Sequence, residues 1–275
     1  MTVVLEAGLE AKPKWQPNLD GERVVEGIHY GWLMRDHLAR YDYAARFCKG
    51  KRVLDVATGT GYGANILRRA GAAEVVAVDR EQGALDYAEQ RYGTDGLRWV
   101  NGNAYELPFE REFDVVISFE TIEHLKEPER FVRECKRVAK PGGQFIVSTP
   151  ENVGGPLCSE FHEFEYNRRE FREVLERNFP RVELMGQRRE LSMVYKPLGD
   201  LPGRYWWNNV RQGRGSQIFF TFMDRINKAP NQLLAWANGY TDKVRSEIRP
   251  IEAPLQLSRL LKPHYFVMLG ICVVD

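Results

Sequence analysis

The chain has 275 residues, of which 43% are hydrophobic and 28% are charged, a composition that can bury a full core and excludes a globally disordered chain. Its 39 Lys and Arg nearly balance 38 Asp and Glu, so no bulk charge draws it onto nucleic acid or a membrane surface. Four scattered cysteines without CxxC spacing disfavour a disulfide framework or a zinc site. No apolar run reaches the ~20 residues that cross a bilayer, and the first dozen residues lack the order of a signal peptide. We expect a soluble, cytoplasmic protein.

The first two thirds of the chain alternate between strand-like and helical patterns. Short β-branched runs predict strands at 51–56, 74–78, 97–100, 113–119 and 144–149. Helical periodicity predicts helices at 62–70, 81–92 and 127–139, the last of which ends at the turn sequence KPGG, residues 140–143. This alternation predicts an α/β fold, with a parallel sheet covered by helices on both faces.

The last third of the chain changes character. A helix near 168–178 and strands at 181–188 and 265–274 continue the first pattern. Between these two strands, residues 190–262 carry 11 Lys and Arg against 6 Asp and Glu and are rich in aromatic residues. Because the sheet resumes after this stretch, we interpret it as a basic, aromatic insertion into one domain.

A glycine-containing loop follows the first strand. Gly59 and Gly61 come directly after a buried strand and at the start of a helix, where backbone amides can approach a ligand without interference from a Cβ atom. Asp79 ends the next strand, where a carboxylate can accept both hydroxyls of a ribose. With Ala64 the two glycines also satisfy GxGxxA, so the pattern alone leaves NAD open as the ligand. Asp55 before the loop favours S-adenosylmethionine, because a carboxylate there suits a cationic amino group and repels a pyrophosphate.

At this point the sequence resembles the class I S-adenosylmethionine-dependent methyltransferases, from about residue 51 to 188 and again at the final strand. The acidic-x-Gly-x-Gly-x-Gly loop of that family corresponds to residues 55–61, with an alanine in place of the first glycine. The resemblance implies a Rossmann-like sheet of seven strands with the last one antiparallel. It also implies these cofactor-binding residues: Asp55, Ala57, Gly59, Gly61, Asp79, Arg80, Asn103, Ala104 and Phe119. Residues 101–104 resemble the segment that holds the adenine, with Asn103 where the family has Asp and still able to bond the amino group of the base.

The resemblance also divides the chain. Residues 1–50 are expected to form a helical segment over the cofactor, 51–189 the methyltransferase core, 190–262 a substrate lid and 263–275 the final core strand. In the first segment, residues 37–41 are expected to pack near the carboxylate of the cofactor. Arg40 is then a cofactor-binding residue, with a solvated or core-capping role as the alternative.

A second cluster of candidate residues follows the fourth strand. On a helical turn the positions i, i+3 and i+4 share one face, so Glu120, Glu123 and His124 are expected to converge. His162, in the loop after the fifth strand, can reach the same point because the carboxyl ends of parallel strands meet at one edge. Two carboxylates and imidazole form a credible divalent-metal site. The alternative is that the two acids cap the following helix and His124 packs in the core.

This cluster resembles the small-RNA 2′-O-methyltransferases of plants and bacteria, which hold a divalent metal with an ExxEH segment and a later His in an HxFEW-like context. The ubiquinone-pathway O-methyltransferases carry a similar ExxEH. The matching residues are Glu120, Glu123, His124 and His162; Phe164 and Glu165 also match, and Tyr166 stands where the motif has Trp.

These observations predict a metal-assisted O-methyltransferase. Mg²⁺ or Mn²⁺ is expected to hold two adjacent oxygens of a small-molecule or glycan acceptor, with His124 or His162 as the alternative general base. A hydroxyl of a sugar, glycoside or other diol is the first choice of acceptor and an RNA 2′-hydroxyl the second. Stacking by the aromatic insertion and anion binding by Arg211, Arg214 and Arg225 would give acceptor specificity.

Other interpretations remain open at this stage. An oxidoreductase that uses NAD, and a protein that binds S-adenosylmethionine without turnover, would share the glycine loop. No membrane partner is expected, and the sequence leaves open whether the chain forms a homo-oligomer.

Overall fold

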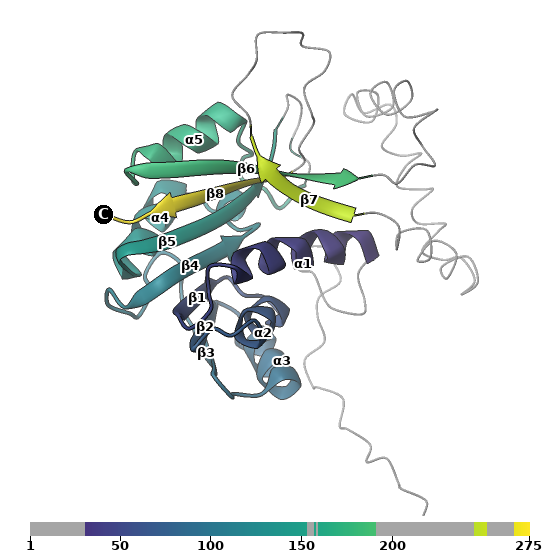
Figure 1. Cartoon of the computed structure of the whole chain (residues 1–275), viewed down its shortest axis with the longest axis vertical. Helices are drawn as coiled ribbons and strands as arrows, with labels where there is room; N and C mark the ends of the chain where they lie inside the picture. The colour runs from purple at the N-terminus through teal and green to yellow at the C-terminus, as the bar shows by residue number, and fades with distance from the viewer. Residues whose placement is uncertain (1–30, 153–156, 158, 191–244, 252–266) are drawn as a thin grey trace, which may run out of the picture.

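The computed structural model describes residues 31–152, 157, 159–190, 245–251 and 267–275 (Figure 1). Among them, eight strands form one sheet: β1 Arg52–Val56, β2 Glu74–Asp79, β3 Leu97–Asn101, β4 Phe113–Phe119, β5 Ala139–Pro150, β6 Arg181–Glu190, β7 Arg245–Pro250 and β8 Val267–Val273. The helices are α1 Gly31–Ala45, α2 Tyr62–Arg69, α3 Gln82–Tyr92, α4 Pro128–Val138 and α5 Arg168–Glu176, with a short 3-10 turn at Ile122–His124.

The strand order is β3-β2-β1-β4-β5-β8-β6-β7. The first five of these strands run parallel, and β8 lies antiparallel between β5 and β6. The expected seven-stranded sheet with an antiparallel last strand is therefore confirmed. An eighth strand, β7, pairs antiparallel with the outer edge of β6 and comes from within the predicted insertion.

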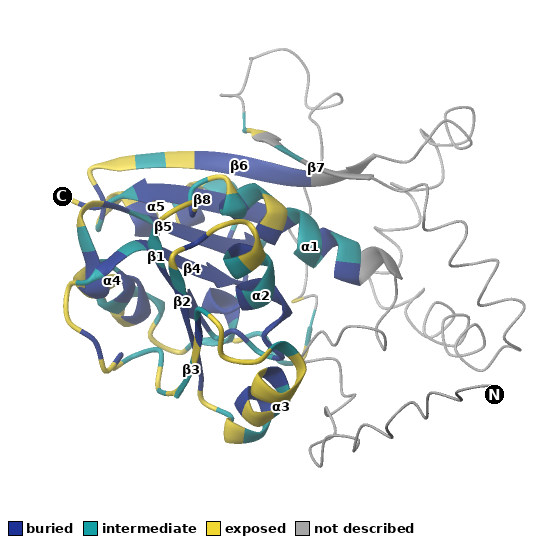
Figure 2. Cartoon of the chain, turned by 60° about the horizontal axis from the view of Figure 1, so that its bottom comes forward, coloured by how far each residue is buried: buried dark blue, intermediate teal, exposed yellow. Residues whose placement is uncertain are grey.

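Helices cover both faces of the sheet, as the alternation of elements predicts (Figure 1). Neighbouring residues of each buried strand point to opposite faces: Val53 and Val115 pack with residues of α1 and α2, whereas Leu54 and Val116 pack with α4 and α5. Figure 2 shows the central strands buried and the outer surface of α3 exposed. The central strands are therefore apolar on both sides, which explains their continuous hydrophobic runs.

The KPGG sequence has the expected effect on the chain. Helix α4 ends at Val138, and β5 begins with the next residue. Phe113 of β4 pairs with Ala139, whereas Val115 pairs with Gln144, so residues 140–143 bulge out of the ladder. Gly142 has φ = 74°, a left-handed conformation that glycine adopts without strain.

The position of β1 in the sheet determines where a ligand-binding crevice can form. Because β1 lies between β2 and β4, the chain crosses over in opposite directions on its two sides, and a crevice opens at the carboxyl ends of these strands. None of the helices among the described residues has the length and apolarity needed to span a bilayer.

Candidate active site

The loop after β1 turns sharply through three left-handed residues. Gly59 has φ = 59° and Gly61 has φ = 78°, and Ala57 adopts φ = 59° where the related loop has glycine. The alanine therefore keeps the glycine-like backbone at a cost in strain. A Cβ atom on Gly61 would lie 2.6 Å from Ala88 and 2.8 Å from Trp99, so this glycine permits close packing of α2 against its neighbours.

Asp79 at the end of β2 holds the loop in place. Its Oδ2 accepts a hydrogen bond from the Gly59 amide at 2.9 Å, and its Oδ1 accepts one from the Glu81 amide at 3.0 Å. A carboxylate oxygen can accept more than one hydrogen bond. Asp79 can therefore fix the loop and still receive the hydroxyl groups of a ribose.

Asp55 lies beneath the loop and is fully buried. Its carboxylate accepts hydrogen bonds from the hydroxyl of Tyr41 on α1, at 3.1 Å, and of Thr58, at 2.6 Å. Burial raises the pKa of Asp55 to about 7, although both hydroxyls lower it. The ring of Tyr41 packs directly on Gly63, where a Cβ atom would overlap it. Asp55 thus ties α1 to the loop.

The raised pKa of Asp55 predicts a pH-dependent stability. A carboxyl group with a folded pKa near 7 and an unfolded pKa of about 3.9 binds more protons in the folded state between these values. The free energy of unfolding should therefore fall as the pH rises from 4 to 7, by up to a few kcal/mol. Urea unfolding of the wild type and of Asp55→Asn at several pH values measures this effect. An equal pH dependence of the two proteins over this window would contradict it.

A cavity of about 400 Å³ opens at the carboxyl ends of β1, β2, β3 and β4. This volume suits a small-molecule ligand. The predicted residues that line it are Ala57, Gly59, Asp79, Arg80, Asn103, Ala104, Phe119, Glu120 and His124. His37 and Tyr41 of α1 and Tyr62 of α2 complete part of the wall, and the Tyr62 hydroxyl lies 2.9 Å from Nδ1 of His37.

Three predicted cofactor residues take other positions. Asp55 at the end of β1 and Gly61 at the end of the loop are buried and do not line this cavity. Arg40 is 1% exposed and also lies off the cavity wall: its Nη1 donates to Oε1 of Gln187 on β6 at 2.6 Å. Gln187 in turn donates to the carbonyl of Asp36. Arg40 thus fastens α1 to the sheet, the core role that the sequence left as an alternative.

The residues after β4 and β5 form an acidic and imidazole cluster. Glu123, His124 and His162 each offer a ligand atom, and these atoms all lie within 4.8 Å of one another. The two imidazole rings meet edge to face at 4.8 Å between centroids. Glu123 is fully buried, and its Oε1 has no hydrogen-bond partner among the described residues. Burial raises the pKa of Glu123 well above its usual range, and the nearby Glu120 raises it further.

Glu120 lies beside this cluster but outside it. It lines the cavity, and its Oε1 accepts a hydrogen bond from the Ser148 hydroxyl at 2.8 Å. Its backbone has φ = 51°, an uncommon conformation for glutamate that is found at functional sites. The structure therefore joins three of the four predicted metal ligands and places the fourth on the adjoining wall.

Both imidazoles are held by hydrogen-bond acceptors. Nδ1 of His124 lies 2.9 Å from the carbonyl of Phe161, and Nδ1 of His162 lies 2.8 Å from Oε1 of the buried Glu165. Carbonyl and carboxylate oxygens only accept, so each Nδ1 donates; in a neutral imidazole with this tautomer, Nε2 is the nitrogen that bears the lone pair. This arrangement is typical of histidines that bind metals and of histidines that act as bases.

Three polar residues support this cluster. The sequence matched Glu165 to the motif without giving it a role, and it singled out neither Ser148 nor Thr149. Glu165 orients His162, Thr149 donates to Oε2 of Glu123 at 3.1 Å, and Ser148 binds Glu120. Ser148 and Thr149 are polar residues at the carboxyl end of a buried strand, a signal that could have identified them. Arg211, Arg214, Arg225 and the aromatic residues of 191–244 lie outside the described residues.

Comparison with known proteins agrees with this geometry. Residues 54–147 match the family described as methyltransferase domain. These residues are thus similar to a methyltransferase domain. A protein of Mycolicibacterium smegmatis named "Probable S-adenosylmethionine-dependent methyltransferase" is 37% identical over 166 residues, which are 58% of this chain and 63% of the relative. The chain thus spans less than two thirds of that relative's length.

Solved structures share the fold of this chain. Phosphoethanolamine N-methyltransferase 2 of Haemonchus contortus, in complex with S-adenosyl-L-methionine, gives a TM-score of 0.51 at 19% identity, covering 86% of this chain and 52% of that one. The [4+2]-cyclase SpnF gives 0.51 at 19% identity, covering 87% and 80%. One fold therefore hosts N-methylation and cyclisation, so the reaction of this domain must be argued from its site.

Proposed function

We propose that the protein transfers a methyl group from S-adenosylmethionine to a hydroxyl oxygen of a sugar, glycoside or other diol-bearing small molecule. The observation that carries the proposal is the composition of one cavity wall. Asp79 and the glycine loop suit the ribose and methionine parts of the cofactor, while Glu120 and His124 line the same cavity. A methyl donor held by Asp79 and the glycine loop would therefore lie in the same cavity as the proton acceptors Glu120 and His124.

The cluster supplies what an alcohol acceptor needs. Methyl transfer to an alcohol requires removal of the hydroxyl proton, and alcohols hold that proton tightly at neutral pH. His124 lines the cavity with its Nδ1 hydrogen-bonded to the Phe161 carbonyl, so its Nε2 can accept a proton. His162 donates its Nδ1 proton to the carboxylate of Glu165, which fixes the orientation of the ring.

The same cluster fits a divalent cation. Ligand atoms about 2.1 Å from an ion lie at most ~4.2 Å apart, so a set within 4.8 Å needs only small adjustments. The buried Oε1 of Glu123, which has no hydrogen-bond partner in the described part of the chain, is the kind of atom that a cation would satisfy. Carboxylate suits Mg²⁺, and two imidazoles favour Mn²⁺ or Fe²⁺. When bound, such an ion lowers the pKa of a nearby hydroxyl and orients adjacent oxygens.

Removal of metal tests this proposal. We expect the purified protein to lose methyl transfer to diol acceptors after treatment with a chelator and to regain it with Mn²⁺ or Mg²⁺. Mass spectrometry of nucleotide sugars and of RNA incubated with S-adenosylmethionine measures the reaction and separates the two acceptor classes. Full turnover of the metal-stripped protein would contradict the metal and leave a histidine base. An absence of methylation on any hydroxyl would contradict O-methylation itself.

A further inference from the structure

The segment after β3, residues 102–109, contributes one wall of the cavity and forms no helix or strand. Residues 102–105 line the cavity, and residues 106–109 lead away from it to β4. Within the segment, the Asn103 side chain accepts a hydrogen bond from the Tyr105 amide at 3.0 Å, and a single bridge joins Asn103 to Glu106. A backbone without ladder partners must find hydrogen bonds elsewhere.

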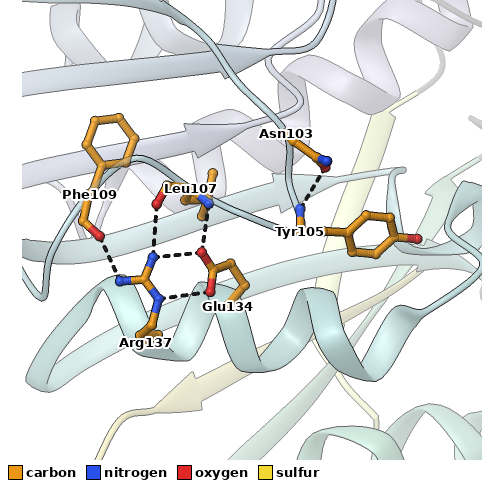
Figure 3. A network of polar contacts seen from close by, with 6 residues as sticks. All are labelled: Asn103, Tyr105, Leu107, Phe109, Glu134 and Arg137. Atoms are coloured by element: carbon orange, nitrogen blue, oxygen red, sulfur yellow. Dashed lines mark hydrogen bonds and ion pairs between the residues drawn. The ribbon is translucent and has the colours of Figure 1, made fainter.

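Two side chains of α4 supply these hydrogen bonds (Figure 3). Arg137 donates from Nη1 to the carbonyl of Phe109 at 2.8 Å and from Nη2 to the carbonyl of Leu107 at 2.9 Å. Glu134 accepts from the Leu107 amide at 2.7 Å. The segment is thus held at three backbone groups by one helix.

Glu134 and Arg137 also fix each other. Arg137 pairs with both carboxylate oxygens of Glu134, Nε with Oε2 at 2.9 Å and Nη2 with Oε1 at 2.7 Å. Such a two-point contact sets the direction of the guanidinium as well as its position. The hydrogen bond to Arg137 lowers the pKa of Glu134, so the pair stays charged.

The first residue of the segment is hydrogen-bonded to the end of β2. The Gly102 amide donates to the carbonyl of Asp79 at 3.0 Å. Leu107 and Phe109 are buried in the core, at 3% and 7% exposure. The cavity-facing residues therefore lie between two anchors, the end of β2 and the Glu134–Arg137 pair.

We propose that Glu134 and Arg137 are positioning residues that set the affinity and selectivity of the site for the adenine base, without contacting the cofactor. The proposal rests on the proposed use of S-adenosylmethionine. By holding Leu107 and Phe109, the pair fixes the part of the cavity wall that Asn103, Ala104 and Tyr105 form. In a loosened segment the Asn103 side chain would leave the position in which it can bond the amino group of adenine. That amino group would then lose a hydrogen bond, while the contacts common to both purines would remain.

Binding of two product analogues tests this role. S-adenosylhomocysteine and S-inosylhomocysteine differ only at the purine, where an oxygen replaces the amino group. We expect wild-type protein to prefer the adenosyl compound in calorimetric titrations. Arg137→Lys keeps the charge but loses the two-point contact, and Glu134→Gln loses the charge. Both should lower this preference about tenfold, the cost of one or two hydrogen bonds.

The control is Arg133→Lys, an exposed arginine of the same helix that pairs with Glu129 at 3.6 Å. It should keep the wild-type preference. Unchanged preference in Arg137→Lys and Glu134→Gln would overturn the inference, and so would equal weakening of both ligands, which indicates a general loss of structure. Circular dichroism verifies that each variant is folded. If Arg137→Lys does not fold, the ratio of the two affinities measured for Glu134→Gln tests the inference alone. Failure of the wild type to bind S-adenosylhomocysteine would instead overturn the proposed cofactor.

Discussion

Replacement of Glu123 by glutamine should lower the rate of methyl transfer about 10³-fold, within the range for loss of an acid–base or metal-binding group. Glu123 is the buried carboxylate of the cluster, within 4.8 Å of ligand atoms of His124 and His162. Glutamine has nearly the same shape and can still accept a hydrogen bond from Thr149, but it has no charge to offer a cation or an imidazolium.

The same substitution should leave the fold intact. One oxygen of the carboxyl has no hydrogen-bond partner among the described residues, and burial raises the pKa of Glu123. At neutral pH the folded state therefore bears a free-energy cost for this titratable group that a neutral amide avoids. We therefore expect the thermal midpoint of Glu123→Gln to equal or exceed that of the wild type. Loss of activity with retained stability distinguishes a functional residue from a structural one.

The control for this prediction is Glu127→Gln, nearby in sequence, whose side chain is 59% exposed and pairs with Arg130. Its activity and its thermal midpoint should match those of the wild type. Initial rates with S-adenosylmethionine in excess, together with thermal unfolding, give both quantities. Wild-type turnover by Glu123→Gln would remove the cluster from the mechanism.

Replacement of Asp79 by asparagine should weaken binding of S-adenosylhomocysteine about 100-fold, because two hydrogen bonds to a charged acceptor would be lost or weakened. The carboxylate of Asp79 lines the cavity and also accepts the amides of Gly59 and Glu81. Asparagine has one acceptor oxygen, so it cannot hold the loop and both ribose hydroxyls together.

Calorimetric titration measures this effect directly. Asp86→Asn on α3 is the matched control, because Asp86 is exposed and accepts a hydrogen bond only from Gln82 among the contacts described for it. Its affinity should equal that of the wild type. Equal affinity of Asp79→Asn and the wild type would show that the ribose binds elsewhere.

The local sequence determined the fold of this protein to a large extent. The predicted strand at 113–119 agrees with β4 residue for residue, and the predicted helix at 62–70 ends one residue beyond α2. These elements are encoded by short-range patterns, because the hydrophobic period and the turn residues act on the backbone within a few positions. The same holds for Gly59 and Asp79, whose places at the ends of strands follow from the strands themselves.

Which side chains face the cavity depended on tertiary structure. Arg40 and Asp55 are charged residues that the sequence assigned to the ligand, yet both are buried in contacts with distant partners, Gln187 and Tyr41 respectively. Strand β7 was likewise not predicted from the sequence. Its charged sequence RSEIRP has no strand-like hydrophobic pattern, and it forms a strand by pairing with the edge of β6.

The cluster of Glu123, His124 and His162 depends on both the local sequence and the tertiary structure. The sequence by itself determined the residue types and placed them after two parallel strands. Their convergence was decided by contacts across 37 to 40 positions: the Glu163 amide bonds to the carbonyl of Glu123 at 2.9 Å, and His124 bonds to the carbonyl of Phe161. Periodicity specifies which way a residue faces on its own element, but the distance between two loops is set by how their elements pack.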